Sequence, residues 1–168
     1  MNQEPLQRIH KNAIKAWRTL SLLLGLLWFI PSAFYLVMEI SVSTKEAPWY
    51  SEIDWILLLS MFLIALILYV AFPLIFPKIR WQRWKYEVSD EGIDMLRGII
   101  IKKRTMVPIN RVQHVDTRQG PIYRKYDLAS VTISTAATTH EIPALDNETA
   151  DELRNTISTL VRKIQSDV

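Results

Sequence analysis

Two long runs of apolar residues dominate the first half of the chain. Residues 20–38 contain no charged side chain, and residues 53–76 are interrupted only by Asp54 near the start and Pro73 near the end. As a helix the first run is about 28 Å long, which matches a bilayer hydrocarbon core of about 30 Å. Neither run has the polar face with a period of 3.6 residues that a helix on a soluble domain shows. The pattern predicts two transmembrane helices, at residues 20–38 and 53–76, joined by an external loop at residues 39–52.

The lysines and arginines around these runs predict the orientation of the hairpin. Residues 1–19 hold four of them and residues 77–85 hold four, whereas the loop holds only Lys45. Because cationic flanks stay in the cytoplasm, we expect a protein that crosses the cell membrane twice and has both termini in the cytoplasm. Pro48, Trp49 and Tyr50 lie in the loop, and the two aromatic residues suit a membrane interface. A signal peptide cleaved near residues 41–43 is the less favoured alternative, because the first run exceeds the usual length of about 7–15 apolar residues.

The segment at residues 5–18 has a different pattern, with apolar residues on one side of a helical wheel and cations on the other. One reading is a basic amphipathic helix at the lipid headgroups, and an equally weighted one is a short cytoplasmic tail that is partly disordered. The apolar positions are Leu6, Ile9, Ala13, Ile14 and Trp17, and the basic positions are Arg8, Lys11, Lys15 and Arg18.

Residues 77–168 have the composition of a small cytoplasmic domain. They carry 15 of the 20 Lys and Arg residues and 12 of the 17 Asp and Glu residues, a net charge of +3. Alternation of apolar and polar residues predicts strands at residues 81–88, 93–96 and 99–107, two more within 111–136, and another at 138–142. Asp146 is a good N-cap for a final helix. The apolar face of that helix comprises Ala150, Leu153, Ile157, Leu160, Val161 and Ile164. We therefore expect an α+β domain in which a curved antiparallel sheet is covered by a C-terminal helix.

Residues 111–136 concentrate histidine, aspartate, arginine and tyrosine, so they are the natural place to look for an active site. His114 and Asp116 fall on one face of a predicted strand and could form a metal site with His140. A structural pair is the favoured interpretation, because no third ligand is supported by spacing.

Nothing else in the sequence indicates catalysis. Ser130, Ser134 and Thr135 lie in no nucleophile elbow or triad-like context, and the four glycines form no phosphate-binding loop. The absence of cysteine excludes disulfides, thiolate zinc sites and cysteine nucleophiles. We expect a non-enzymatic protein with no cofactor and no metal. The small net charge on a tethered domain also disfavours nucleic acid.

Basic clusters are the remaining candidates for a binding surface. The residues expected to contact a partner or lipid are Tyr123, Arg124, Lys125 and Tyr126, together with Lys102, Lys103 and Arg104. The cations that flank the predicted spans are Arg8, Lys11, Lys15, Arg18, Lys78, Arg80, Arg83 and Lys85. Juxtamembrane cations gain about 1 kcal/mol each near anionic lipid. For residues 78–85, however, a role in orienting the spans is favoured.

Three stretches carry a resemblance to a known family. WQRWKYEVSDEGIDMLRG at 81–98, VPINRVQHVDTRQGPIYRKYDLASVTI at 107–133 and HEIPALDNETADELR at 140–154 follow two apolar spans. The chain resembles the bacterial PH-like membrane proteins of the YdbS type over nearly its whole length. The resemblance implies a PH-like fold and a companion, a larger multi-span membrane protein with several such domains.

Two functions follow as hypotheses. In the first, the PH-like domain mediates assembly with a partner membrane protein, and the resemblance connects this assembly with envelope protection. In the alternative, it is an anionic-lipid-binding module at the inner leaflet. The PH-like fold is not itself evidence for phosphoinositide binding, because a fold does not determine function. Neither hypothesis identifies a small-molecule ligand.

Overall fold

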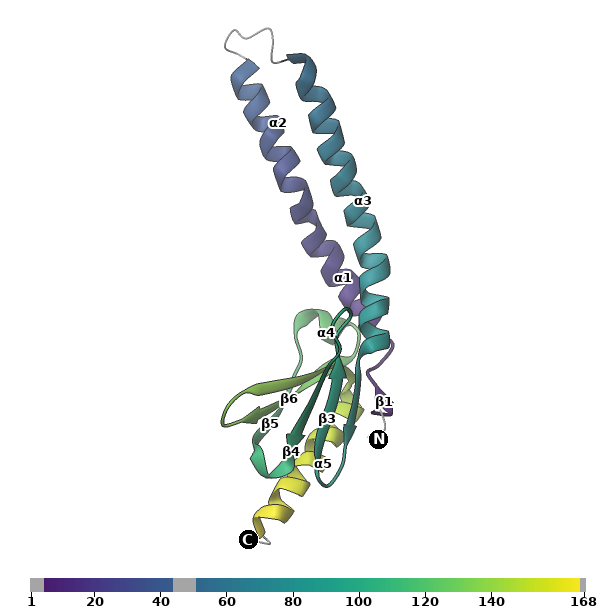
Figure 1. The fold of residues 1–168 in the computed structure, drawn as a ribbon, viewed down its shortest axis with the longest axis vertical. Coiled ribbons are helices and arrows are strands. Elements are labelled where there is room, and N and C mark those ends of the chain that lie inside the picture. Colours follow the sequence, from purple (N-terminus) through teal and green to yellow (C-terminus); the bar gives the residue numbers. More distant parts are fainter. Residues whose placement is uncertain (1–4, 44–50, 167–168) are drawn as a thin grey trace. The chain divides into compact units, whose positions relative to one another are not determined.

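A computed structural model describes residues 5–43 and 51–166 of the 168-residue chain (Figure 1). The chain forms two compact units. One unit, called here the domain, combines the N-terminal segment that ends at Trp17 with Pro77–Val168, and the other comprises Arg18–Phe76. Lys45, Pro48, Trp49 and Tyr50, singled out in the expected external loop, lie outside the described residues.

The two predicted apolar helices are confirmed. The first apolar stretch consists of α1 (Ala13–Gly25), the 3₁₀ turn η1 (Leu26–Phe29) and α2 (Ile30–Ser43), and the second is α3 (Ser51–Arg83). Both are long and apolar enough to cross a bilayer, with mean hydropathies of 2.0 and 2.7. In the most apolar 18-residue stretch of each helix, only 11% and 6% of the stretch is buried within the protein, whereas the core helices of soluble proteins are mostly buried. The 3₁₀ turn ends two residues before Pro31, which lacks the N–H group that would continue an α-helical ladder.

The helices of the second unit pack through small and aromatic side chains. The ring centroid of Phe29 lies 5.5 Å from that of Phe62 and 5.6 Å from that of Tyr69. A Cβ atom at Gly25 would lie 2.8 Å from a ring carbon of Tyr69, which is closer than side chains normally approach. Gly25 therefore permits close packing of α1 against α3 at this level.

The domain contains two antiparallel sheets and a long helix (Figure 1). The first sheet has the order β1 (Gln7–Arg8), β2 (Lys85–Val88), β3 (Gly92–Arg97) and β4 (Lys103–Pro108). The second has the order β5 (Val112–Arg118), β6 (Leu128–Thr135) and β7 (Thr139–Asp146). A 3₁₀ turn, η2 (Ile109–Arg111), joins the sheets, α4 (Pro121–Lys125) joins β5 to β6, and α5 (Asn147–Ser166) ends the domain. The expected α+β architecture is confirmed.

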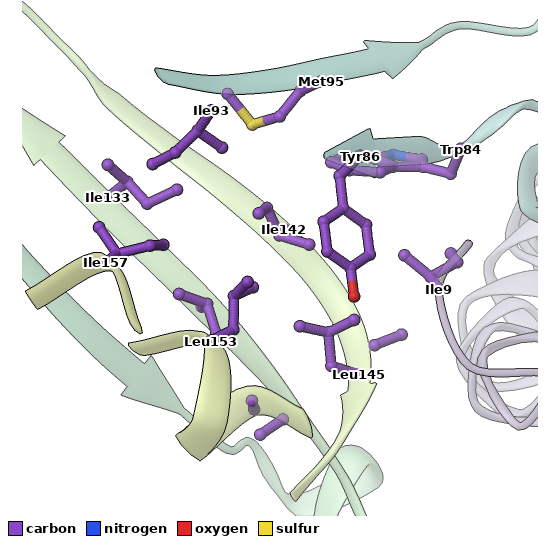
Figure 2. Close-up of a cluster of buried hydrophobic side chains, with 14 of the residues drawn as sticks. Ile9, Trp84, Tyr86, Ile93, Met95, Ile133, Ile142, Leu145, Leu153 and Ile157 are labelled. Carbon is purple, nitrogen blue, oxygen red and sulfur yellow. The ribbon is translucent and has the colours of Figure 1, made fainter. Parts of the chain in front are cut away.

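The core lies between the two sheets and α5 (Figure 2). Strand β2 contributes Tyr86, and Trp84 lies just before it; both are nearly inaccessible, as the alternating pattern predicted. On α5 the predicted apolar face is confirmed, since Ala150, Leu153 and Ile157 are buried and the later apolar residues pack against the core. The backbone N–H of Thr149 donates to Asp146 Oδ2 at 3.0 Å, so Asp146 caps this helix as expected.

Two predicted strands begin too early in the sequence. Residues 81–83 continue α3, and the strand starts only at Lys85. Residues 99–101 lie in the loop between β3 and β4, and the third strand starts at Lys103. The β-branched isoleucines favour a strand locally, but the turn at Gly98 and the pairing of Arg97 with Lys103 leave them in the connection between strands.

Of the two equally weighted readings of residues 5–18, the amphipathic helix is wrong in its first half. Residues 7–8 form a strand paired with β2, and helix α1 begins only at Ala13. The apolar residues Ile9, Ala13 and Trp17 are buried in the core of the domain, with exposures of 2%, 0% and 5%. Ile9, Ala13 and Trp17 therefore face protein and not lipid headgroups, whereas Leu6 is exposed.

Candidate functional site

One end of the domain gathers the cations and aromatic residues that the sequence singled out. We call it the entry end, and define it by Trp17, residues 77–83, the loop at residues 98–102 and α4. Here the chain leaves the domain after Trp17 and returns at Pro77. Its side chains can therefore act where the domain is continuous with the apolar helices.

Trp17 holds the entry end together. Its indole Nε1 donates a hydrogen bond to the hydroxyl of Tyr123 on α4 at 3.2 Å. The guanidinium carbon of Arg80 lies 4.1 Å from the centroid of the Trp17 ring, a cation–π contact. Burial raises the pKa of the Tyr123 phenol, and Glu141 adds to this effect against the opposing influences of the Trp17 hydrogen bond and Arg80. Tyr123 is thus a neutral structural group at physiological pH.

A second tryptophan fastens the N-terminal segment. Trp81 Nε1 donates to the carbonyl oxygen of Ile9 at 3.0 Å, and the guanidinium of Arg8 lies 5.7 Å from the Trp81 ring centroid. Further along, the backbone N–H of His10 donates to the carbonyl of Ala144 at 3.0 Å. The segment at residues 5–17 is therefore an integral part of the domain.

The predicted recognition turn at residues 123–126 contains two half-buried tyrosines and two exposed cations. Residues 123–125 lie in the short helix α4 and Tyr126 follows it; Tyr123 and Tyr126 are half-buried and pack against the core. Asn12 Nδ2 donates to the carbonyl of Tyr126 at 3.4 Å. Only Arg124 and Lys125 are exposed, so they alone are available to a lipid or partner.

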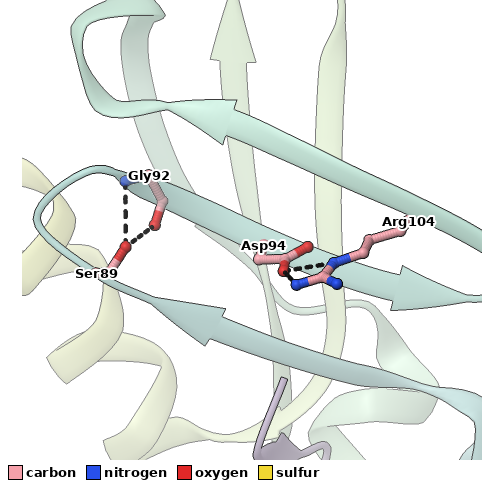
Figure 3. A network of polar contacts seen from close by, with 4 residues as sticks. All are labelled: Ser89, Gly92, Asp94 and Arg104. Atoms are coloured by element: carbon pink, nitrogen blue, oxygen red, sulfur yellow. Dashed lines mark hydrogen bonds and ion pairs between the residues drawn. The ribbon is translucent and has the colours of Figure 1, made fainter. Parts of the chain in front are cut away.

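The three cations at residues 102–104 also differ from one another in their contacts. Arg104 Nε donates to Asp94 Oδ2 at 2.8 Å across the β3–β4 hairpin (Figure 3). The other carboxylate oxygen of Asp94 is buried without a hydrogen-bond partner among the described residues, which makes the ion pair to Arg104 more important. Lys102 and Lys103 are exposed.

The span-flanking cations are mostly exposed, although the structure draws several into contacts. Arg80 lies over Trp17, Arg8 lies over Trp81, and Arg8 is directly opposite Lys85 in the β1–β2 pairing. The exposed members are Arg8, Lys11, Lys15, Arg18, Lys78 and Arg83.

The histidines do not converge on a metal site. Within residues 5–43 and 51–166, no group of three His, Asp or Glu side chains could hold a metal ion. His114 and Asp116 lie on exposed positions of β5, opposite Ser134 and Thr132. His140 lies on β7, and its pKa is lowered by burial and by the charges of Arg97 and Lys103.

Sequence reasoning missed a cleft between the two sheets. It has a volume of about 510 Å³ and is lined by the end of β4, by η2, by the start of β5 and by the hairpin that joins β6 to β7. Its lining includes Met106, Pro108, Arg111, Gln113, Thr138 and His140. Met106 is 55% exposed at this cleft, and no local sequence pattern indicates that exposure.

Comparisons with known proteins agree with this architecture. The bacterial PH domain family model matches residues 20–161. The chain is 39% identical over 168 residues to the UPF0699 transmembrane protein YdbS of Bacillus subtilis (strain 168), with both chains covered completely. It is also 24% identical over 83 residues to the UPF0699 transmembrane protein YdbT of the same organism, which covers 47% of this chain and 17% of YdbT. No solved structure matches the chain. The chain belongs to the bacterial PH domain family and is a membrane protein of that family.

Proposed function

We propose that this protein is a non-enzymatic subunit that docks another membrane protein at the cleft between β4 and β5. The observation that carries the proposal is the pair of sheet edges at this cleft. Among residues 5–43 and 51–166, strand β4 pairs only with β3, and β5 pairs only with β6. Edge strands present backbone N–H and C=O groups that can accept an additional strand.

The side chains around the cleft suit a protein partner. Met106 is 55% exposed on β4, and flexible methionines are favourable at adaptable binding surfaces. Arg111 and Gln113 offer polar contacts on the other side. An extended segment of a partner would gain backbone hydrogen bonds from an edge strand and specificity from these side chains.

The partner we favour is a larger transmembrane protein with related domains. Its support is the similarity of part of this chain to a small fraction of YdbT, which is a much longer transmembrane protein. The excess of cations at residues 1–19 and 77–85 supports placing both termini and the domain in the cytoplasm. An envelope-protection role would be a property of the assembly.

A photocrosslinking experiment in native membranes tests this proposal. A benzophenone amino acid replaces Gln113 in the full-length chain, and a matched variant carries it at Glu152, an exposed position on α5. We expect position 113 to crosslink a membrane protein that mass spectrometry identifies as containing bacterial PH domains. Equal crosslinking at both positions, or none at position 113, contradicts docking at the cleft.

The exposed cations of the entry end favour anionic lipid as a second candidate function. Arg124, Lys125 and Lys102 are exposed at this end, and the exposed Lys103 directly follows Lys102. Native mass spectrometry of the intact protein can count retained anionic lipids. We expect Arg124→Ala with Lys125→Ala to retain fewer, whereas the exposed pair Arg162→Ala with Lys163→Ala should not differ from wild type. Equal retention in both variants argues against this function.

A further inference from the structure

The loop at the tip of the β3–β4 hairpin exposes apolar side chains. Ile100 is 94% exposed and Ile101 is 81% exposed, more than any other large apolar residue described in the chain. Ile99 beside them is half-buried. Surface isoleucines at single positions are ordinary, but adjacent ones at a protruding tip indicate a surface that binds something apolar.

The register of the hairpin places this tip at the entry end. Lys85 follows α3 almost directly, and its partner across the sheet is Leu96. Strand β3 then continues past this pair through Arg97 into the loop. At about 3.3 Å per residue, the tip extends roughly 10 Å beyond Leu96. Residues 77–83 of α3 span a similar distance, about 10 Å of helix.

The backbone of the loop is built for this protruding shape. Gly98 has a φ of +117°, a conformation that side-chain-bearing residues rarely adopt. A Cβ atom at this position would overlap the carbonyl oxygen of Ile101. The turn therefore folds tightly on itself and leaves the side chains of Ile100 and Ile101 on the outside.

Cations follow the apolar tip. Lys102 and Lys103 are exposed immediately after Ile101, while Arg104 is held by Asp94 on the sheet. An apolar tip followed by lysines matches the layering of a membrane surface, in which acyl chains lie beneath anionic phosphates. A hydrophobic cleft on a partner protein would have no such requirement for two adjacent exposed lysines.

We propose that the β3–β4 hairpin is a membrane anchor that inserts Ile100 and Ile101 into the bilayer crossed by the apolar helices, with Lys102 and Lys103 at the lipid phosphates. The anchor gives the domain a third attachment beside the two connections at Trp17 and Pro77. Three attachments fix the tilt and rotation of the domain at the membrane, which two neighbouring connections cannot. The proposal does not depend on docking at the β4–β5 cleft.

Single-cysteine labelling of the full chain tests the anchor, and the absence of native cysteine makes each label unique. The protein is reconstituted alone, at low density, into liposomes of phosphatidylcholine and phosphatidylglycerol. A fluorophore is placed by Ile100→Cys, and quenching is compared between bromine-labelled lipid and aqueous iodide. We expect strong quenching by the lipid and weak quenching by iodide.

Two matched positions keep the result interpretable. Met106→Cys places the same label on an exposed apolar site of β4 away from the tip, and Glu91→Cys places it in the turn at the opposite end of β3. Both should be quenched by iodide and not by lipid, which shows that the fluorophore does not insert by itself. Iodide quenching at Ile100→Cys equal to that at Glu91→Cys overturns the proposal. Shielding from both quenchers also overturns it, because that result indicates contact with protein.

A label that leaves both isoleucines in place provides the second measurement. Lys102→Cys carries the fluorophore, with or without Ile100→Asp and Ile101→Asp. Because these aspartates lie in a loop outside the core, the domain should still fold, which hydrogen exchange of β6 can check. We expect the aspartates to reduce lipid quenching at position 102 several-fold. Unchanged quenching in the folded double variant contradicts insertion of the tip.

Discussion

Two apolar segments of this protein lie in environments that differ from those their sequences predict. Ile9, Ala13 and Trp17 match a helix on lipid headgroups, yet they are buried in the domain. Residues 99–101 match a strand in a sheet, yet Ile100 and Ile101 are the most exposed large apolar residues that the structure describes. A local apolar pattern thus indicates a face that can be covered, and long-range packing determines which residues the domain buries.

The largest expected difference in the free energy of unfolding is between isoleucine-to-alanine substitutions in the two segments. Ile9→Ala removes buried methyl and methylene groups and should lower the free energy of unfolding of the domain by about 2–5 kcal/mol. Ile100→Ala should change it by less than about 0.5 kcal/mol, since the side chain is exposed in the domain. Denaturant unfolding of the full chain in micelles, followed by hydrogen exchange in β6, measures both. Equal effects would show that residue 9 is not part of the core.

The shape of the exposed tip depends on Gly98, which gives a smaller effect. Gly98→Ala should cost about 1–3 kcal/mol, because its positive φ disfavours a side chain. Gly120→Ala is the control: its φ is −77° and a Cβ atom there meets open space. We expect that variant to unfold like the wild type in the same assay. A harmless Gly98→Ala would mean that the loop adopts another turn.

The smallest expected effect on stability comes from the hydrogen bond between Trp17 and Tyr123, which holds the buried N-terminal segment. Tyr123→Phe removes the acceptor for Trp17 Nε1 and should cost about 1 kcal/mol. A double-mutant cycle with Trp17→Phe should show coupling, whereas independent effects would exclude the hydrogen bond as a source of stability.

Tyr123 also predicts a pH dependence. Burial raises its pKa in the folded state above the ordinary value of 10.0. The folded state therefore keeps the phenolic proton at a pH where the unfolded chain loses it. The stability from neutral Tyr123 should be complete below about pH 10 and should fall as the pH rises through the higher folded pKa. Tyr123→Phe should weaken this alkaline loss in pH-dependent unfolding, and an unchanged alkaline profile would contradict the role of this phenol.

Local patterns predicted the parts of the fold that depend on one segment at a time. The two apolar runs identify their helices, and the spacing of Ala150, Leu153 and Ile157 identifies the buried face of α5. The end of α3 at Arg83 and the start of β4 at Lys103 were missed, because strand pairing and not local propensity determines them. Residues 7–8 could not be recognised as a strand, because their partner β2 lies far away in the sequence.

The candidate site was predictable only as a set of residue types. The sequence identified the cations of the entry end. It did not show that Arg104 forms an ion pair with Asp94 or that Tyr123 accepts a hydrogen bond from Trp17. The cleft between β4 and β5 could not be found, since it depends on the order of strands in two sheets. The protruding tip was hidden by the strand propensity of its isoleucines.

Thiol alkylation at residues 6 and 9 tests most directly that the N-terminal segment belongs to the domain. On an amphipathic helix, Leu6 and Ile9 would share one lipid-facing side, whereas Leu6 is 77% exposed and Ile9 is 2% exposed in the structure. In liposomes we expect Leu6→Cys to react quickly with a water-soluble maleimide and Ile9→Cys to react only after the domain unfolds. The contradicting result is that both cysteines are equally protected in liposomes and both react in detergent while the domain stays folded. That result would place the segment on lipid.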